Sequence, residues 1–264
     1  MTILTNDGLL AVTGLLNVQT LPQVLAVGPQ QDSAAAWAAA QSEALAGLRR
    51  SGLVDGYDDV DTELAAALHV LAQPERELVA RIHTGAGVRR VCLARRGDRH
   101  AVATRDGDIF DVRTTWADAT GATLARPLLD ALGACPPAAT PSFSAPAEAL
   151  RERLDGAADS SGYTQALYEL GVEERTAIEF GLALSTCTAY SEIVAYAHGD
   201  GVTQRSAGAV VVYDTERGRL VASPGTSPDQ QLWSTFTAGS DHRIAEAVSA
   251  LVHSLPVGGW GWMS

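Results

Sequence analysis

The chain has 264 residues, a formal net charge of −12 and 46% hydrophobic residues. This length suits one large domain, or two closely associated halves, with a substantial core. The acidic charge argues against a nucleic-acid partner, because phosphate binders need a clustered basic surface, and it opposes docking on anionic lipid. All basic residues other than histidine are arginine, which excludes lysine Schiff-base chemistry and a lysine phosphate-binding loop.

Membrane insertion is not expected, because the sequence has no run of about 18 consecutive apolar residues. The first residues, MTILTNDGLLAV, lack the basic segment and the cleavage site of a secretory signal, so we expect a cytoplasmic protein. Cys92, Cys135 and Cys187 are far apart and odd in number. They predict free thiols rather than a disulfide framework or a zinc site.

The first half of the chain begins with helical patterns and continues with strands. Residues 5–16 are expected to form a helix or a turn, and apolar spacing predicts helices over residues 33–52 and 61–74, capped by Ser33 and Asp61. A short strand is expected over residues 24–27. Four longer strands separated by Gly-containing turns are then predicted over residues 78–83, 90–95, 99–104 and 109–115.

A helix over residues 124–132 precedes the segment 134–147, whose Ala and Pro content predicts a linker. Pro127 is expected in the first turn of that helix or at a kink. Three short helices and four strands follow, over residues 147–154, 163–170 and 173–184, and over residues 190–196, 209–213, 220–222 and 232–236. A last helix is predicted from a Ser240 cap to Leu255, with Pro256 and Gly258 as its stop.

The two halves, residues 1–133 and 148–264, repeat one order of helices, four strands and a helix. This order predicts a single domain over residues 1–264 with pseudo-two-fold halves. Consecutive strands joined by short turns pair antiparallel. We therefore expect an α+β fold with a central, mostly antiparallel sheet.

Catalytic motifs are scarce. The sequence has no HExxH, no GxSxG and no phosphate-binding loop. Asp98 and His100 flank a predicted hairpin turn, and a plain turn explains them better than acid–base chemistry because no third group orients the histidine. The other histidines, His198 among them, are isolated in the sequence. Neither a metal nor another cofactor is therefore expected.

The segment from Asp214 to Trp260 contains the order DT…GRL…SP…W.TF..G, followed by a helix and an LP.G.W ending. Together with YSEIV at residues 190–194, CLARRGDRHAVATRDGD at residues 92–108 and LP.VLA at residues 21–26, this order resembles the EspG family. These proteins are cytosolic, secretion-associated chaperones of actinobacterial type VII (ESX) systems.

The resemblance implies a central antiparallel sheet with an N-terminal and a C-terminal helical bundle. It also implies a protein that is not an enzyme. Such a chaperone binds a cognate PE–PPE heterodimer and covers the hydrophobic tip of the PPE subunit, which removes an aggregation hazard. Two alternatives stay open: a small cytosolic enzyme of unknown reaction, and an adaptor domain without secreted cargo.

The resemblance places the partner surface on the sheet, the C-terminal bundle and the loop between the second and third strands. That loop, residues 84–88, is short here. Aromatic residues on a partly open sheet face make good interface anchors, although packing in the core is the alternative for each aromatic residue. The candidate partner-binding residues share an alternating strand face or this loop, and are Gly85, Ala86, Gly87, Tyr190, Val194, Tyr196, Trp233 and Thr235.

Two further expectations concern the ends of the fold. Edge strands and a pseudo-two-fold sheet allow a weak homodimer. The ending Trp260-Gly261-Trp262 is unusual, and it suggests that the C-terminus makes a contact of its own.

Overall fold

The computed structural model describes residues 2–255, 259 and 260. The first half of the chain contains β1 (Thr2–Thr5), α1 (Asn6–Leu15), the short 3-10 helix η1 (Gln23–Leu25), α2 (Ala34–Arg50), α3 (Thr62–Ala72), β2 (Arg76–Thr84), β3 (Gly87–Arg96), β4 (Arg99–Asp106), β5 (Ile109–Thr115) and α4 (Gly121–Leu132). The second half contains β6 (Phe143–Pro146), α5 (Ala147–Leu154), α6 (Ser160–Glu169), α7 (Glu174–Leu184), β7 (Cys187–Gly199), β8 (Val202–Arg205), β9 (Val210–Thr215), β10 (Gly218–Thr226), β11 (Leu232–Ala238) and α8 (Asp241–His253).

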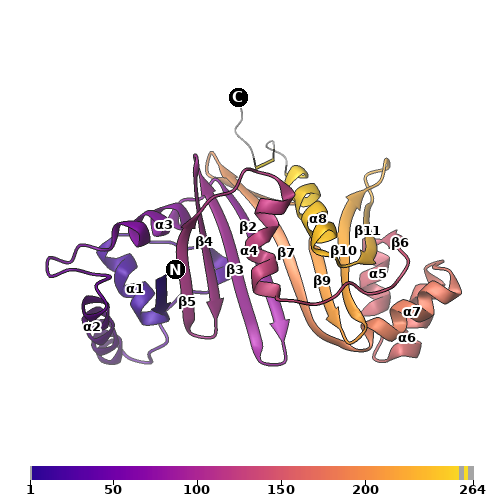
Figure 1. Ribbon diagram of the computed structural model, residues 1–264, viewed down its shortest axis with the longest axis horizontal. Coiled ribbons are helices and arrows are strands. Elements are labelled where there is room, and N and C mark those ends of the chain that lie inside the picture. Colours follow the sequence, from indigo (N-terminus) through magenta and orange to yellow (C-terminus); the bar gives the residue numbers. More distant parts are fainter. Residues whose placement is uncertain (1, 256–258, 261–264) are drawn as a thin grey trace.

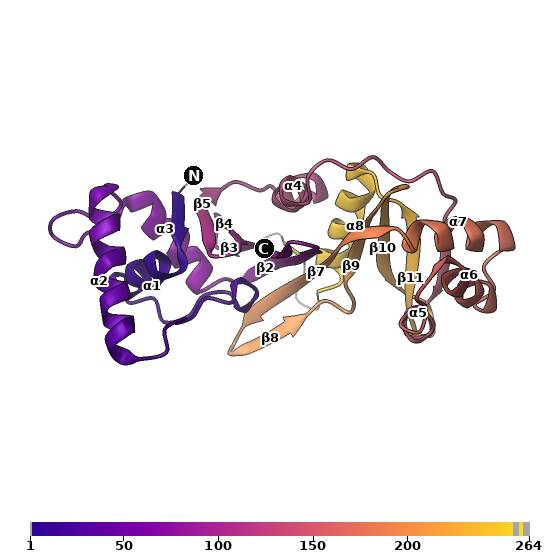
Figure 2. The same ribbon diagram turned by 90° about the horizontal axis from the view of Figure 1, so that it is seen from below.

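One sheet holds all the named strands in the order β1-β5-β4-β3-β2-β7-β9-β10-β11-β6 (Figure 1), and β8 pairs with β7 beside this path (Figure 2). The ladders between these strands are antiparallel. The prediction of an α+β fold with a central antiparallel sheet is therefore confirmed.

The sheet has pseudo-two-fold order about the ladder that joins β2 to β7. Outward from this ladder, β2, β3, β4, β5 and β1 follow on one side, and β7, β9, β10, β11 and β6 follow on the other. In each half a short edge strand and a set of helices come first along the chain, then the main strands, then one helix. The two halves of the chain therefore contribute their strands in the same order, counted outward from the central ladder.

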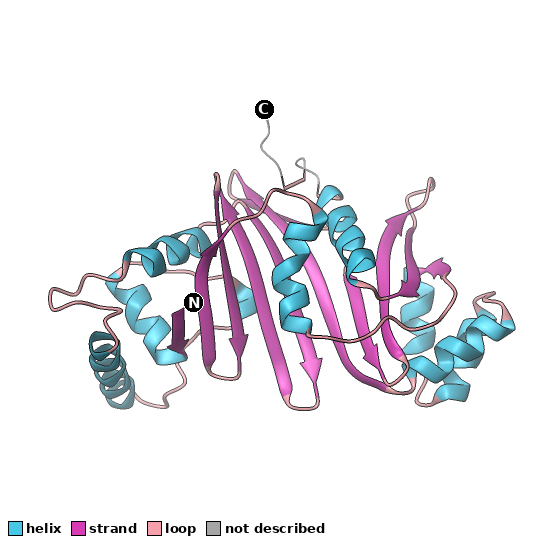
Figure 3. Cartoon of the chain, viewed as in Figure 1, coloured by secondary structure: helices cyan, strands magenta, loops and turns pink. Residues whose placement is uncertain are grey.

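Three hydrophobic cores lie against this sheet. Helices α4 and α8 cover the middle of one face. On the other face, α1 to α3 cover one end and α5 to α7 cover the other. Figure 2 shows α4 and α8 on one side of the sheet and β8 projecting from the other, and Figure 3 shows the two helical bundles flanking the strands. The pleat separates the cores, since Leu78 faces α4 and α8 whereas its neighbour Val79 joins the α1–α3 core.

Side-chain caps fix where several helices begin. Ser33, Asp61 and Ser240 accept hydrogen bonds from the backbone N–H groups of Ala36, Leu64 and Arg243, as the sequence predicted. The predicted stop of the last helix at Pro256 and Gly258 lies outside the described residues. Within the described part of the chain, no helix combines the length and the hydropathy needed to span a bilayer.

Helices α4 and α8 approach each other closely at Gly121. A Cβ atom at this position would lie 2.3 Å from the carbonyl oxygen of Ala245 and 2.9 Å from the Cβ atom of Ser249. Glycine is therefore required by the close approach of the two backbones. Pro127 lies in the interior of α4, beyond the first turn.

The predicted strand over residues 24–27 is wrong. Residues 23–25 form η1 instead, and Ala26 ends it with a left-handed φ of 50°. Two arginines explain this turn, because Arg90 donates a hydrogen bond to the carbonyl oxygen of Val24 and Arg105 donates one to that of Leu25. The carbonyl groups of η1 are therefore satisfied by guanidinium groups instead of a neighbouring strand.

The segment 134–147 is more structured than a linker. Its last part forms β6, which pairs with β11. The backbone N–H of Ala138 donates to the carbonyl oxygen of Arg219 at 2.9 Å, and the N–H of Arg219 donates to the carbonyl oxygen of Pro136 at 2.7 Å. Strands β1, β6 and β8 were not predicted, because a four-residue strand is too short to show a clear alternation of apolar and polar residues.

Candidate partner-binding site

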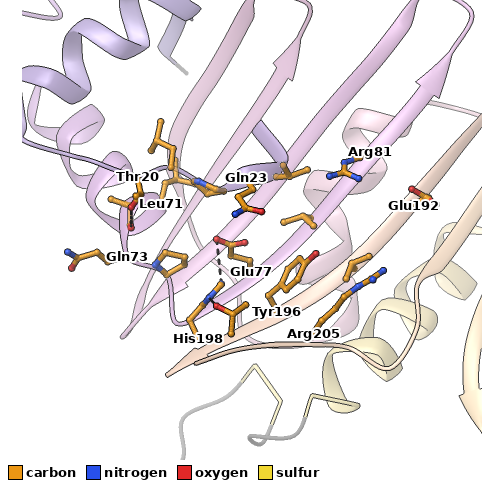
Figure 4. Close-up of a pocket in the computed structure, with 18 of the residues that line it drawn as sticks. Thr20, Gln23, Leu71, Gln73, Glu77, Arg81, Glu192, Tyr196, His198 and Arg205 are labelled. Carbon is orange, nitrogen blue, oxygen red and sulfur yellow. Dashed lines mark hydrogen bonds and ion pairs between the residues drawn. The ribbon is translucent and has the colours of Figure 1, made fainter. Parts of the chain in front are cut away.

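A groove lies on the face of the sheet opposite α4 and α8, beside the N-terminal bundle. Its floor is formed by β2, β7 and β8, and its wall by residues 20–24 and 71–74 (Figure 4). The volume of this groove is about 620 Å³. The strand residues that line it are Glu77, Val79, Arg81, Glu192, Val194, Tyr196, His198, Thr203 and Arg205.

Strand pleating brings these side chains to one face. Along β2, Glu77, Val79 and Arg81 alternate with the buried residues Leu78 and Ala80, which face α4 and α8. The antiparallel register places Tyr196 opposite Glu77, Val194 opposite Val79 and Glu192 opposite Arg81. The floor of the groove is therefore a mixed surface, with apolar residues between charged ones.

The wall of the groove depends on two half-buried arginines. Arg90 and Arg105 lie beside Arg81 in register on β3 and β4, and they hold the carbonyl groups of η1. The guanidinium group of Arg105 also lies 5.1 Å from the centre of the Phe110 ring. These contacts fix residues 20–24 against the sheet.

An acid and an imidazole meet on the groove floor. Oε1 of Glu77 lies 3.6 Å from Nε2 of His198, and Nδ1 of His198 lies 3.0 Å from Oγ1 of Thr203. Burial raises the pKa of Glu77 to about 7. Burial also lowers the pKa of His198, and the charge of Arg76 adds to this effect. Since both shifts favour neutral groups, we describe this contact as a carboxyl beside an imidazole and not as an ion pair.

The predicted residues of β7 share the face of the groove, and the predicted residues of the β2–β3 hairpin lie at the end of these strands. Val194 and Tyr196 line the groove, where Figure 4 shows Tyr196 beside His198 and Arg205. Tyr190 is 41% exposed and stacks on His83, with ring centres 4.5 Å apart. The hairpin turn with Gly85, Ala86 and Gly87 follows directly, because Thr84 pairs with Ala189.

Trp233 and Thr235 lie on the opposite face. Val221 of β10 packs in the α4–α8 core and is paired with Thr237 of β11. Thr235 and Trp233 follow at two-residue steps and therefore point to the same side as Val221. Thr235 shares a hydrogen bond with Ser144 of β6. The structure therefore brings the predicted residues together in two separate places.

Glu77, Arg81 and Arg205 were not predicted as site residues, and His198 is isolated in the sequence. His198 meets Glu77 only through the ladder between β2 and β7, which joins residues more than a hundred positions apart. One signal was present in β2, where Glu77, Arg81 and His83 alternate with apolar residues. Among the described residues, no group of three or more His, Cys, Asp or Glu side chains is arranged to hold a metal ion.

A family model described as the EspG family matches residues 5–250. The chain belongs to the EspG family. The chain is 31% identical to the ESX-3 secretion-associated protein EspG3 of Mycolicibacterium smegmatis, over 97% of this chain and 88% of that protein. It is 28% identical to the ESX-1 secretion-associated protein EspG1 of Mycobacterium tuberculosis, with the same shares covered.

A solved structure has the same fold as this EspG family member. It is the Mycobacterium tuberculosis type VII secretion system chaperone EspG5 in complex with a PE25–PPE41 dimer. The TM-score is 0.82 at 22% sequence identity, with 100% of this chain and 99% of that chain covered. The sheet flanked by two helical bundles is therefore the fold of the family.

Proposed function

We propose that this chain is a cytoplasmic type VII secretion chaperone, not an enzyme, that binds a PE–PPE-type heterodimer and covers the hydrophobic tip of its PPE subunit. The observation that carries this proposal is the match of the whole chain to the EspG family and to the fold of a chaperone solved with such a dimer. Shielding an exposed apolar tip removes an aggregation hazard during transport.

The docking surface that we propose is the sheet face between the bundles. It offers an exposed aromatic residue, Tyr190, a groove lined by Val194 and Tyr196, and the hairpin at residues 85–87. Apolar and aromatic groups among polar ones are typical of protein interfaces. Trp233 and Thr235, on the other face, belong to this surface only if the partner also reaches the end of β11.

One observation favours a second candidate, a small hydrolase. The imidazole of His198 lies between the hydroxyl of Thr203 and the carboxyl of Glu77, in the order hydroxyl, imidazole, carboxyl. The pKa of Glu77, raised by burial to about 7, opposes this role, because a protonated carboxyl does not stabilise an imidazolium ion. A hydrolase screen that finds turnover in the wild type but none in Thr203→Ala would support the enzyme instead of the chaperone.

Co-expression with PE–PPE pairs tests the chaperone. We expect one pair to be recovered with this chain as a stoichiometric heterotrimer in the cytoplasmic fraction, and its PPE subunit to precipitate when this chain is left out. Recovery of the chain alone, with every pair equally soluble without it, would refute the proposal and favour the adaptor domain without cargo.

A further inference from the structure

The Glu77 carboxyl lies on the groove floor with little solvent around it and with an imidazole as its basic neighbour. The side chain of Glu77 is 11% exposed. Among the described residues, His198 is the basic side chain within 4 Å of its carboxyl, at 3.6 Å. Burial and the charge of Arg76 lower the pKa of this histidine, so it is a poor source of positive charge. An ionised Glu77 is therefore poorly compensated in the free protein.

The other charged groups near Glu77 lie at a greater distance on the same face of the sheet, or on the opposite face. Val79 separates Glu77 from Arg81 on β2, and the wall at residues 20–24 and 71–74 carries no titratable group. Arg76 lies on the opposite face, in register with Ala197 on one side and with Arg95 on the other. There Arg76 donates a hydrogen bond to the carbonyl oxygen of Gly259. The titratable and charged groups on the side of Glu77 include His198, Cys92, Glu192, Tyr196 and Arg205, the row of Arg81, Arg90 and Arg105, and the pair of His83 and Tyr190.

We propose that docking of the partner over this groove is coupled to the uptake of a proton by Glu77. The inference rests on the proposed function, because it assumes an apolar protein surface as the occupant. Such a surface removes the water that solvates the Glu77 carboxylate and offers no charge in return. Adding a proton from solvent to one carboxyl oxygen costs less than burying the unpaired charge, so the complex holds Glu77 neutral.

The sign of the pH dependence follows from linkage. The free carboxyl has a pKa of about 7, and docking raises it further. Affinity is therefore highest below pH 7 and falls as the free groove ionises above pH 7. If the carboxyl stays protonated in the complex, the dissociation constant rises about tenfold from pH 6 to pH 8. A partner that placed a cation on Glu77 would give the opposite slope.

The test uses the PE–PPE heterodimer recovered with this chain by co-expression. Its affinity is measured from pH 6 to pH 8 for the wild type, Glu77→Gln and Glu192→Gln. Glu192 is an exposed carboxyl on the same face, so Glu192→Gln is the matched control. We expect the wild type and Glu192→Gln to lose about tenfold in affinity over this range, while Glu77→Gln binds with one affinity throughout. Affinity that rises with pH, or a slope unchanged in Glu77→Gln, would overturn the inference.

A second measurement needs no variant and is independent of the folding of Glu77→Gln. Calorimetric titrations of the wild type at pH 7, in two buffers with different heats of ionisation, count the protons taken up on binding. We expect about half a proton per complex, because the free carboxyl is about half ionised at its pKa. Binding with no uptake overturns this inference alone. No binding at any pH overturns the proposed function as well.

Discussion

Glu77 and Tyr190 lie on one face of the sheet but in different surroundings. The Glu77 side chain is 11% exposed on the groove floor, whereas Tyr190 is 41% exposed beside the β2–β3 hairpin. Glu77 therefore affects the stability of the free protein through its charge. Tyr190 is available for contact with a partner, and removing its ring should change the unfolding free energy little.

Glu77→Gln should change how stability depends on pH. A Glu carboxyl that ionises near 4.5 in the unfolded chain ionises at about 7 in the folded one. Between these values the folded state keeps a proton that the unfolded state has lost, so the stability from this group is complete below pH 4.5 and is lost as pH rises through 7. The loss is about 3 kcal/mol.

Chemical denaturation at pH 5 and pH 8 measures this effect. We expect the wild type to lose more unfolding free energy than Glu77→Gln between the two pH values, because the amide cannot ionise. Equal losses in the two proteins would show that the folded environment does not hold the proton on Glu77.

Tyr190→Ala should weaken partner binding with little effect on folding. Exposed aromatic residues at interfaces carry about 1–2 kcal/mol or more, so the dissociation constant should rise on the order of tenfold. The unfolding free energy should stay within about 1 kcal/mol, because the ring contacts mainly His83. The control is Tyr57→Ala, which removes a 91% exposed ring from the loop between α2 and α3. Partner binding and thermal unfolding are measured for both variants. Equal affinities for both variants would contradict the docking face.

At the scale of elements, two close contacts join parts of the chain that are distant in sequence. Helices α4 and α8 meet at Gly121, and Arg219 of β10 joins the end of α4 to the second half. Both contacts lie on the face of the sheet opposite the groove. They are therefore expected to affect stability rather than partner recognition.

Gly121→Ala should destabilise the fold. Its new methyl group would meet the backbone of Ala245, which cannot move as a side chain can. Overpacking of this kind costs about 1–3 kcal/mol. Gly85→Ala is the control, since a Cβ atom there has no heavy atom within 4 Å among the described residues. Equal melting temperatures for the two variants would show that α4 and α8 can separate at no cost.

Arg219→Met should destabilise the fold more strongly. Arg219 is 1% exposed, and its guanidinium group donates two hydrogen bonds to the carboxylate of Asp214, at 2.6 and 2.9 Å, and one to the carbonyl oxygen of Gly133. Removing one partner of a buried ion pair costs about 3–5 kcal/mol. Arg175→Met, which breaks an exposed pair with Glu179, should cost less than about 1 kcal/mol in the same denaturation assay. Similar losses for both would contradict this account.

At the scale of the whole molecule, the β2–β7 ladder joins the two halves of the chain into one sheet. It runs from Arg76 opposite Ala197 to Thr84 opposite Ala189 without interruption. The α4–α8 core draws residues from both halves, among them Leu78, Leu124, Ile193 and Val248. Neither half therefore has a core of its own on this face.

Thermal unfolding should follow one cooperative transition. Separating the halves would break the central ladder and expose the shared core together, so residues 1–264 are expected to unfold as a unit. Differential scanning calorimetry measures this directly, with the calorimetric enthalpy expected to equal the van't Hoff enthalpy. Two transitions would show that the halves before and after residues 134–147 are separate domains.

The sequence by itself determined the family, the helix caps and the long strands. Caps at Ser33, Asp61 and Ser240, the alternation of the long strands and the order of motifs from Asp214 to Trp260 depend on neighbouring residues, and they are confirmed. Trp260 is 2% exposed, and its indole N–H donates to Nε2 of His100. Gly261 and Trp262, the rest of that predicted contact, lie outside the described residues.

Only the tertiary structure decided where the groove lies and which residues meet in it. η1 formed in place of a strand because Arg90 and Arg105, more than sixty positions away, hold its carbonyl groups. Glu77 met His198 because β2 pairs with β7 in one register. Local patterns fix which side of a strand a residue faces, but the pairing of distant strands fixes its neighbours, and those neighbours set its burial and its charge.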